Sequence, residues 1–338
     1  MIETPSNNKS IYIINYLKAF AILLVIIGHS FSYFIECNNI LSPDWLGLIY
    51  SVHVPLFIVV AGYLCHKQVL KAYITKKITR ILIPFWFFTT LKLTYSNLIS
   101  SKFAHADSIG EQLYDAFILG RCYWFAYAIF FMYIIAILTW FIEDNRKRRL
   151  FIAFSLIGLL IIQYIQATQH IQITDVFQIR RILQYGGFFC VGLFLNTFSK
   201  EEIGRFYNKY KFILILISII AVLAFFFKLF DGSLLLVKLL SFCCSISLMI
   251  LLYFVVSFLP PKIKILDIIS KYSWQLMLMD SFYKVIIFKI VSKFYLLNYE
   301  IAFIIAILDV VLGVITCLII EKLPYLNFLV GLKSKRNM

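Results

Sequence analysis

Ten predominantly apolar segments dominate this chain of 338 residues. A helix needs about 20 mainly apolar residues to cross the hydrocarbon core of a bilayer, so runs of this length predict transmembrane helices. No polar segment between them is long enough to hold a core of its own. The sequence therefore predicts an all-α, polytopic membrane protein in which residues 1–338 form one membrane-embedded domain. The predicted spans are residues 11–35, 46–65, 81–100, 122–142, 150–166, 179–198, 212–230, 235–258, 272–291 and 300–321.

The composition agrees with a chain whose main partner is the lipid bilayer. Hydrophobic residues make up 62% of the sequence and charged residues only 14%, whereas soluble domains carry roughly 25% charged residues. A net charge of +15 indicates nucleic-acid binding in a polar protein, but here it accompanies 34 Phe and 21 Tyr. This combination argues against a soluble enzyme, a disordered chain and a nucleic-acid binder. The seven cysteines show no CxxC or Cys/His spacing, so we expect neither a metal site nor a disulfide framework.

Basic residues are distributed unevenly between the connections of the predicted spans. Of the 32 Lys and Arg residues, 22 including Lys18 lie at the two termini or in alternate connections, around residues 67–80, 143–149, 200–211 and 262–271. An excess of Lys and Arg in short loops marks the cytoplasmic side of a membrane protein. With an even number of spans, both termini are predicted to lie in the cytoplasm.

The first predicted span contains two polar side chains, Lys18 and His29. They are eleven residues apart, which places them on one helix face with His29 about 16 Å further toward the outside. Taken alone, Lys18 fits either an interfacial anchor that extends to the headgroups or a functional cation. His29 fits either a hydrogen bond within the bundle or a functional group. Because His29 lies too deep to reach the interface easily, its position favours function.

A second histidine, His53, lies at a similar depth in the second predicted span. A short loop joins the two spans, so a helical hairpin brings the imidazoles of His29 and His53 together. A neutral histidine can act as a general base at pH 7 without carrying a permanent charge into the membrane.

Lys77 and Arg80 are three residues apart, on one face of a helix at the predicted cytoplasmic end of span 81–100. They fit the ordinary basic flank of a span. Paired cationic donors are also what the recognition of phosphate or pyrophosphate requires.

Four further side chains lie at the predicted outer ends of spans: Arg121, Trp124, Arg180 and Arg181. Trp124 fits an interfacial aromatic belt. The arginines are unexpected on the outer face, and they are suited to an anionic or hydroxyl-rich substrate that arrives from outside. Within spans lie the carboxyl groups of Asp280 and Asp309, each of which we expect to pair with a buried cation or to stay protonated.

The order of these motifs resembles the membrane-bound acyltransferase family 3. The segments that carry the resemblance are YLKAFAILLVIIGHS, HVPLFIVVAGYL, KKITRILIP and YWFAYAIF, with weaker support from RRILQYGGFFCVGLFL near the middle of the chain. The resemblance, closest to a fucose O-acetylase-like branch, implies a ten-span protein of the bacterial cytoplasmic membrane. It implies transfer of an acetyl group from cytoplasmic acetyl-CoA to a hydroxyl of a cell-surface glycan or its lipid-linked precursor.

The resemblance also implies roles for individual residues. The family's basic residue followed eleven positions later by histidine corresponds to Lys18 and His29, and its basic pair implicated in coenzyme A binding corresponds to Lys77 and Arg80. Lys18 and Lys77 stand where the family more often has Arg, and Asp280 stands where a histidine is common. The resulting hypothesis assigns catalysis to His29 and His53, and coenzyme A binding to Lys18, Lys77 and Arg80. It assigns contacts with the acceptor to four residues at the outer ends of spans: Arg121, Trp124, Arg180 and Arg181. No residue is assigned to a metal.

Two other functions fit a polytopic protein of this size. A transporter of lipid-linked sugars tends to have two pseudo-symmetric halves, and no internal repeat is visible in the sequence. A glycan polymerase is expected to carry a large outer loop, and none of the predicted outer connections is long. An O-acyltransferase is therefore the favoured interpretation.

Overall fold

The computed structural model describes residues 5–99, 108–169, 171, 173, 175–227, 234–291 and 299–332, and every regular element in these ranges is helical. The first half contains α1 (Pro5–Asn38), α2 (Asp44–Tyr63), α3 (Leu70–Lys77), the π-helix η1 (Ile78–Leu82), α4 (Ile83–Ile99), α5 (Ile109–Leu113), η3 (Tyr114–Ile118), η4 (Arg121–Tyr123), α6 (Trp124–Ala136) and η5 (Ile137–Phe141). The second half contains α7 (Asn145–Thr168), η6 (Val176–Gln178), α8 (Ile179–Asn196), α9 (Lys200–Phe226), α10 (Leu234–Ser257), α11 (Lys264–Lys271), α12 (Ser273–Val291), α13 (Tyr299–Ile320) and α14 (Pro324–Leu329).

Each of the ten predicted spans coincides with a helix or a short series of helices. Among the described residues, seven of these are long and apolar enough to cross a membrane, and the protein is a multi-pass membrane protein. The remaining three are α4, α8 and α12, which are shorter or more polar; α12 contains Asp280, Lys284 and Lys289. Residue 100 and residues 228–230, at the ends of two predicted spans, lie outside the described residues. The full count of ten and the side on which the termini lie stay predictions.

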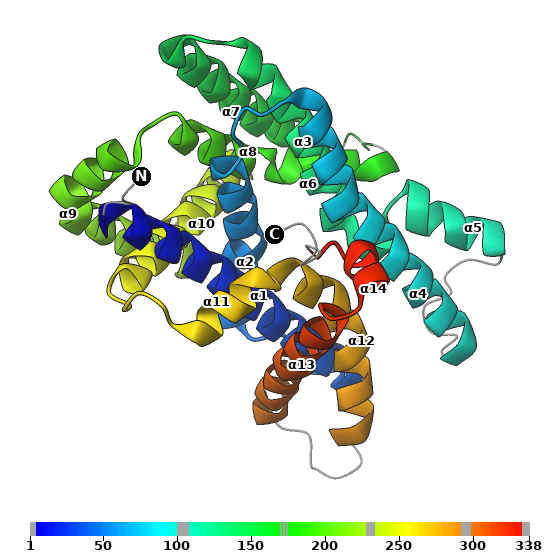
Figure 1. Ribbon diagram of the computed structural model, residues 1–338. Coiled ribbons are helices and arrows are strands. Elements are labelled where there is room, and N and C mark those ends of the chain that lie inside the picture. The colour runs from blue at the N-terminus through cyan, green and yellow to red at the C-terminus, as the bar shows by residue number, and fades with distance from the viewer. Residues whose placement is uncertain are drawn as a thin grey trace.

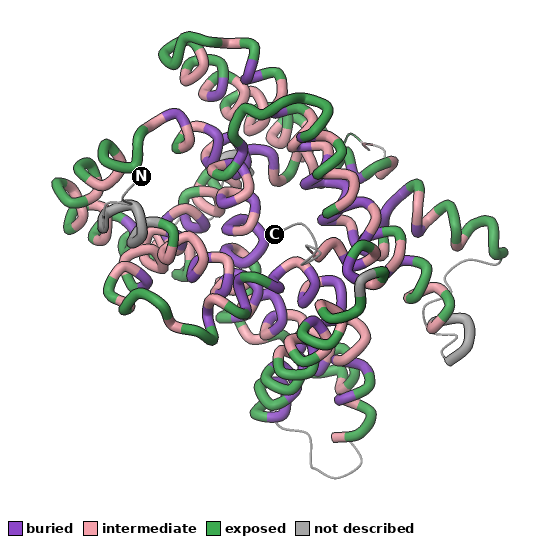
Figure 2. The backbone as a smooth tube through the Cα atoms, viewed as in Figure 1, coloured by how far each residue is buried: buried purple, intermediate pink, exposed green. Residues whose placement is uncertain are grey.

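Helices α1 and α2 occupy the centre of the bundle (Figure 1). Helix α1 packs against α2, α11, α12 and α13, and the opposite part of α2 packs against α8. Buried residues follow α2 and α6 through the interior, whereas α7 and α9 are largely exposed (Figure 2). The two central helices therefore connect the α12–α13 pair on one side with the α7–α10 group on the other.

The contact between α2 and α8 depends on two glycines. A Cβ atom on Gly62 would lie 2.4 Å from the carbonyl oxygen of Phe189, and one on Gly192 would lie 2.1 Å from that of Val59. Helices that pack in a membrane use such small residues to bring their backbones into direct contact. The closeness of α2 and α8 fixes the position of α2 and of the side chains that it carries.

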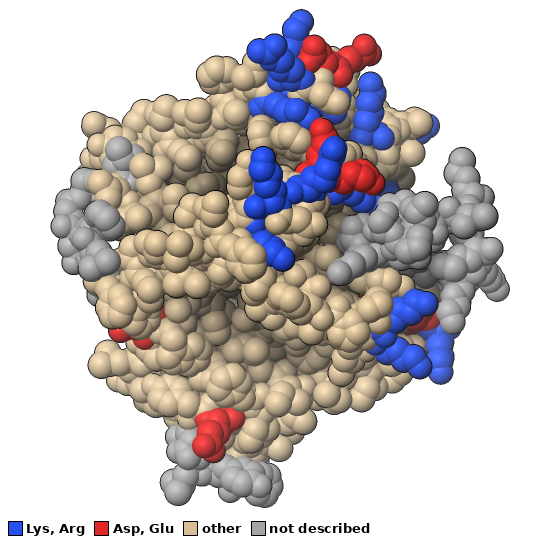
Figure 3. Space-filling model, turned by 90° about the vertical axis from the view of Figure 1, so that its left-hand side faces the viewer, with Lys and Arg blue, Asp and Glu red and all other residues tan. Residues whose placement is uncertain are grey.

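The outer surface is apolar over most of its area. Helix α9 exposes Phe212, Ile213, Leu216 and Ile220, and α7 exposes Phe154 and Ile161. On the face that carries α9 and the start of α1, Lys and Arg side chains gather in one part and most of the remainder is uncharged (Figure 3). Such a surface suits a bilayer, with the basic part at a headgroup region.

Candidate active site

His29 forms a direct hydrogen bond with Asp280, which lies 251 residues further along the chain. Its Nδ1 atom lies 2.7 Å from Oδ2 of Asp280. Helix α1 supplies the histidine and α12 the carboxylate, and the packing of these two helices brings them together. Nδ1 donates to the carboxylate in this arrangement, so Nε2 is the ring nitrogen left with a free lone pair.

The two partners differ sharply in exposure. The side chain of Asp280 is 3% exposed, whereas that of His29 is 38% exposed. A buried carboxylate that holds one nitrogen of an accessible imidazole fixes the orientation and tautomer of the ring. The same carboxylate stabilises the positive charge that the ring acquires when it takes up a proton. This pair has the geometry of a general base and its orienting residue.

Lys284 completes the charge arrangement around Asp280. It lies one helical turn further along α12, and its Nζ donates to the same Oδ2 atom at 3.2 Å. Lys284 is buried, and the carboxyl group of Asp309 on α13 interacts with Asp280 from a neighbouring helix. Asp280 therefore has the buried cation that its place in a predicted span requires.

His53 lies beside His29 but is not hydrogen-bonded to it. The ring centroids are 6.3 Å apart and the ring planes are nearly perpendicular. His53 is buried, and its Nδ1 donates to the carbonyl oxygen of Ile49 at 2.8 Å. The predicted juxtaposition of the two imidazoles is therefore present, and the residue in direct contact with His29 is Asp280.

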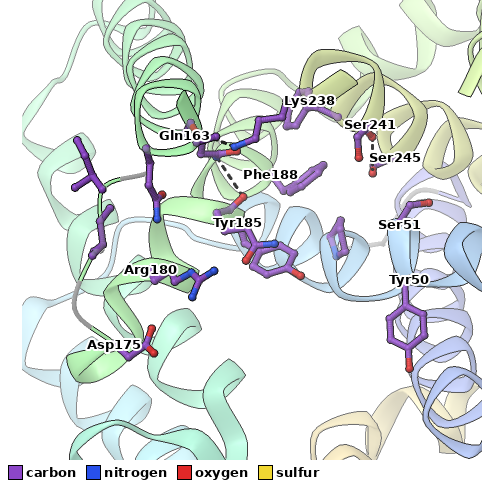
Figure 4. Close-up of a pocket in the computed structure, with 17 residues that line it drawn as sticks. Tyr50, Ser51, Gln163, Asp175, Arg180, Tyr185, Phe188, Lys238, Ser241 and Ser245 are labelled. Atoms are coloured by element: carbon purple, nitrogen blue, oxygen red, sulfur yellow. Dashed lines mark hydrogen bonds between the residues drawn. The ribbon is translucent and has the colours of Figure 1, made fainter. Parts of the chain in front are cut away.

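Tyr50 joins the two histidines to a large cavity. Its hydroxyl donates to the carbonyl oxygen of Gly28 at 3.1 Å, and its ring contacts that of His53 at 4.9 Å between centroids. Tyr50 also lines a cavity of about 860 Å³ between α2, α7, α8 and α10 (Figure 4). Arg180, one of the predicted acceptor residues, lines the same cavity.

The other three predicted acceptor residues do not line this cavity. Trp124 stacks on Tyr185, with ring centroids 5.2 Å apart, and the guanidinium of Arg181 lies 5.0 Å from the centroid of the Trp124 ring. Arg121 forms an ion pair with Asp115 at 2.6 Å. Trp124 thus supports Tyr185, which does line the cavity.

Lys18 lies at the opposite end of its helix face, in a second cavity of about 340 Å³. Asn15, His66, Asn196 and Lys200 line it too. Two of these neighbours are connected, since Nδ2 of Asn196 donates to Nδ1 of His66 at 2.9 Å. Lys18 and His29 therefore face two different open spaces along one helix, and polar groups surround the lysine.

Lys77 and Arg80 have different surroundings. The ammonium of Lys77 lies 3.1 Å from the centroid of the Tyr133 ring and 5.1 Å from that of Tyr73, whereas Arg80 is exposed. The π-helical turn of η1 begins between them and has more residues per turn than an α-helix, which separates their faces. Burial lowers the pKa of Lys77 to about 8.

Sequence reasoning did not assign the partner of His29 or the lining of the large cavity. Asp280 and Lys284 carried a usable signal, because they are an oppositely charged pair four residues apart in an apolar segment. Gln163 and Lys238, which line the cavity, are also isolated polar residues in apolar runs. Within the described residues, no group of His, Cys, Asp and Glu side chains is suited to hold a metal ion.

Comparison of the sequence with known proteins identifies the family of this chain. The sequence is 32% identical to the nodulation protein NolL of Mesorhizobium japonicum over 147 residues, which are 40% of this chain and 38% of that protein. It is 26% identical to NolL of Sinorhizobium fredii over 208 residues, which are 58% of this chain and 51% of that protein. The chain thus spans about half or less of the length of these relatives. No solved structure gives a significant match. The sequence model of the acyltransferase domain matches residues 11–322, and the chain belongs to acyltransferase family 3.

Proposed function

We propose that this protein is an O-acetyltransferase of a bacterial cytoplasmic membrane. It takes an acetyl group from acetyl-CoA on the cytoplasmic side and transfers it to a hydroxyl of a cell-surface glycan or of its lipid-linked precursor. The observation that carries the proposal is the contact between His29 and Asp280, at 2.7 Å, in a chain of an acyltransferase family.

The chemistry follows from the free nitrogen of His29. In direct transfer, Nε2 removes the proton of the acceptor hydroxyl while the oxygen attacks the thioester carbonyl. The carbon–sulfur bond breaks, and the imidazolium returns the proton to the coenzyme A thiolate. In the covalent route, Nε2 attacks the carbonyl, the carbon–sulfur bond breaks and coenzyme A leaves as its thiolate. The acceptor hydroxyl then attacks the acetyl carbonyl, the bond to Nε2 breaks, and the hydroxyl proton passes through the freed Nε2 to the thiolate. Asp280 stabilises the positive ring in both routes, and Lys284 holds Asp280 in place.

The donor binds at the other end of α1. Lys18 and Lys200 line the smaller cavity. Arg80 is exposed, and Lys77, three residues before it, is half-buried. The phosphates of coenzyme A lie against these cations, and the pantetheine arm extends along α1 toward His29. This arrangement explains why a cation and a histidine share one helix face at different depths.

Thiol release from acetyl-CoA by the purified protein tests the proposal. We expect coenzyme A release that requires His29 and increases when a glycan acceptor is added. His29→Gln removes the base and nucleophile, and Asp44→Asn, at the exposed start of α2, is the control variant. Radiolabelled acetyl-CoA without acceptor separates the routes, since only the covalent route leaves label on the protein. A transporter or polymerase would leave acetyl-CoA intact.

The membrane arrangement has its own test. With both termini in the cytoplasm, residues 39–43 between α1 and α2 lie outside. A reporter that is active only outside the cytoplasm is expected to be active when it is fused after Leu41. Activity there of a reporter that works only in the cytoplasm would overturn the topology.

A further inference from the structure

The 860 Å³ cavity has the size and lining of a saccharide site. Pockets for small molecules span about 300–1,000 Å³ and combine apolar walls with a few polar groups. Here the polar groups include the amides of Gln163, Gln166 and Gln184 and the hydroxyls of Ser51, Ser241 and Ser245. Amides and hydroxyls can both donate and accept, as recognition of sugar hydroxyls requires. Gln163, Ser51 and Ser245 already donate to main-chain oxygens and offer a ligand their oxygen atoms as acceptors. Figure 4 shows Gln163, Ser241 and Ser245 on the side of the cavity near Lys238, and Ser51 beside Tyr50 on α2.

Among the residues that the structure describes, no carboxylate forms an ion pair with either of two cations in the lining, Arg180 and Lys238. Nζ of Lys238 donates to the main-chain oxygen of Gln163 at 2.8 Å, which leaves two of its three donors for a ligand. Arg180 makes no hydrogen bond or ion pair with any part of the chain that the structure describes. Asp175, the carboxylate in this lining, forms no ion pair within the same described ranges. The described lining therefore has an excess of positive charge.

Side-chain contacts between helices stabilise the wall of the cavity that α7 and α8 form. Nε2 of Gln163 donates to the main-chain oxygen of Leu183 at 2.8 Å and that of Gln184 at 3.3 Å, which ties α7 to α8. Tyr185 stacks on Trp124 and presents an aromatic ring to the cavity. An aromatic surface held in this way suits the apolar face of a sugar ring.

The cavity adjoins the two histidines through Tyr50. Tyr50 is part of its lining and contacts both the backbone of α1 at Gly28 and the ring of His53. Gly28 precedes His29 directly in the sequence. Tyr50 therefore separates the cavity from the two histidines and contacts both sides.

We propose that this cavity is the acceptor site and that the acceptor is a saccharide carrying an anionic group, which Arg180 and Lys238 bind. This proposal rests on the acetyltransferase function proposed above. The anionic group is a sugar carboxylate or the phosphate of a lipid-linked sugar, and both offer oxygen acceptors to paired cations.

Direct binding tests the site without catalysis. In the His29→Gln protein, calorimetry measures the affinity for three probes: a glucuronic acid-containing disaccharide, its methyl ester, and a prenyl pyrophosphoryl-N-acetylglucosamine. We expect the charged probe that matches the natural acceptor to bind at least tenfold more tightly than the neutral ester. Lys238→Met and Arg180→Gln each remove most of this difference, whereas Lys209→Met, on exposed α9, leaves it unchanged. Equal affinity for all three probes, or unchanged affinity in both cavity variants, would overturn the proposal.

The catalytic readout separates this proposal from the proposed function. In protein with an intact His29, we expect Lys238→Met to raise the KM for the charged acceptor about tenfold, whereas Lys209→Met, on exposed α9, leaves both this KM and the hydrolysis of acetyl-CoA without acceptor unchanged. Lys238→Arg restores the acceptor KM. If charged probes bind but acetyl-CoA is not consumed, the anionic saccharide site stands and the acetyltransferase function fails. If acetyl-CoA is consumed but Lys238→Met leaves the acceptor KM unchanged, the assignment of this cavity fails alone.

Discussion

Replacing Asp280 by Asn tests the role of the buried carboxylate in the reaction. The substitution keeps the size of the side chain but removes its charge, and the amide can offer its NH₂ group instead of an acceptor oxygen to Nδ1 of His29. His29 then loses both the hydrogen bond at 2.7 Å and the compensation for its positive charge. Lys284, which donates to the same oxygen at 3.2 Å, remains as an uncompensated cation close to the ring.

The size of the effect follows from the geometry. Opposite charges centred about 4 Å apart interact by about 4 kcal/mol at an effective dielectric constant of about 20. This energy is gained when the imidazolium forms, so its loss raises the barrier and reduces kcat about a thousandfold. The KM for acetyl-CoA should change little, because Asp280 is buried away from the donor cations.

Coenzyme A release, measured with a thiol reagent on purified protein, gives kcat and KM for the variant. Breaking a buried ion pair on one side also destabilises a protein by about 3–5 kcal/mol. The double variant Asp280→Asn/Lys284→Met controls for this loss, because it removes the unpaired charge. We expect the double variant to recover thermal stability but not activity. Activity of Asp280→Asn within about threefold of the wild type would refute the orienting role.

Three further predictions concern other parts of the structure. First, because the pKa of Lys77 is lowered to about 8, its ammonium loses its proton between pH 7 and pH 9. As the ammonium binds a donor phosphate in the proposed function, the KM of the wild type for acetyl-CoA should rise about tenfold over that range. In Lys77→Arg, whose side chain stays charged, the KM should not change with pH. Second, Gly192→Ala places a methyl group against the backbone of Val59 and reduces stability by about 2 kcal/mol in thermal melts. Third, His53→Gln lowers kcat about tenfold, far less than His29→Gln, because His53 does not bond to the Asp280 pair.

Each of these predictions has an outcome that contradicts it. A pH-independent KM in the wild type would remove Lys77 from donor binding. Gly158→Ala is the control for Gly192, because a Cβ atom there meets no atom within 4 Å, and equal stability of the two variants would refute close packing of α2 on α8. A loss of activity in His53→Gln as large as that in His29→Gln would place His53 in the reaction itself.

Hydropathy was sufficient to predict the long apolar helices but not the short ones between them, such as α3, α11 and α14. Each predicted span coincides with a helix, because the requirement for about 20 apolar residues is a local property of the sequence. The predicted meeting of His29 and His53 is also present, since a short loop between consecutive helices leaves little freedom in their relative depth. These features depend on residues close together in the chain.

The features that sequence reasoning missed depend on long-range packing or on local irregularity. The partner of His29 is 251 residues away and is brought to it by the packing of α12 against α1. Lys77 packs on Tyr133 and Arg80 is exposed, on either side of the start of a π-helical turn that a regular spacing rule does not anticipate. Trp124 was predicted to face the acceptor, but its ring stacks on Tyr185, which lines the cavity instead.

The central claim is that His29, held by Asp280, transfers an acetyl group. The most direct measurement is the release of coenzyme A and the appearance of acetyl ester on a glycan acceptor by purified wild-type and His29→Gln protein in the same membrane mimetic. We predict ester formation by the wild type and a loss of at least a thousandfold in His29→Gln, with both proteins equally folded. Ester formation by His29→Gln at the wild-type rate would contradict the account.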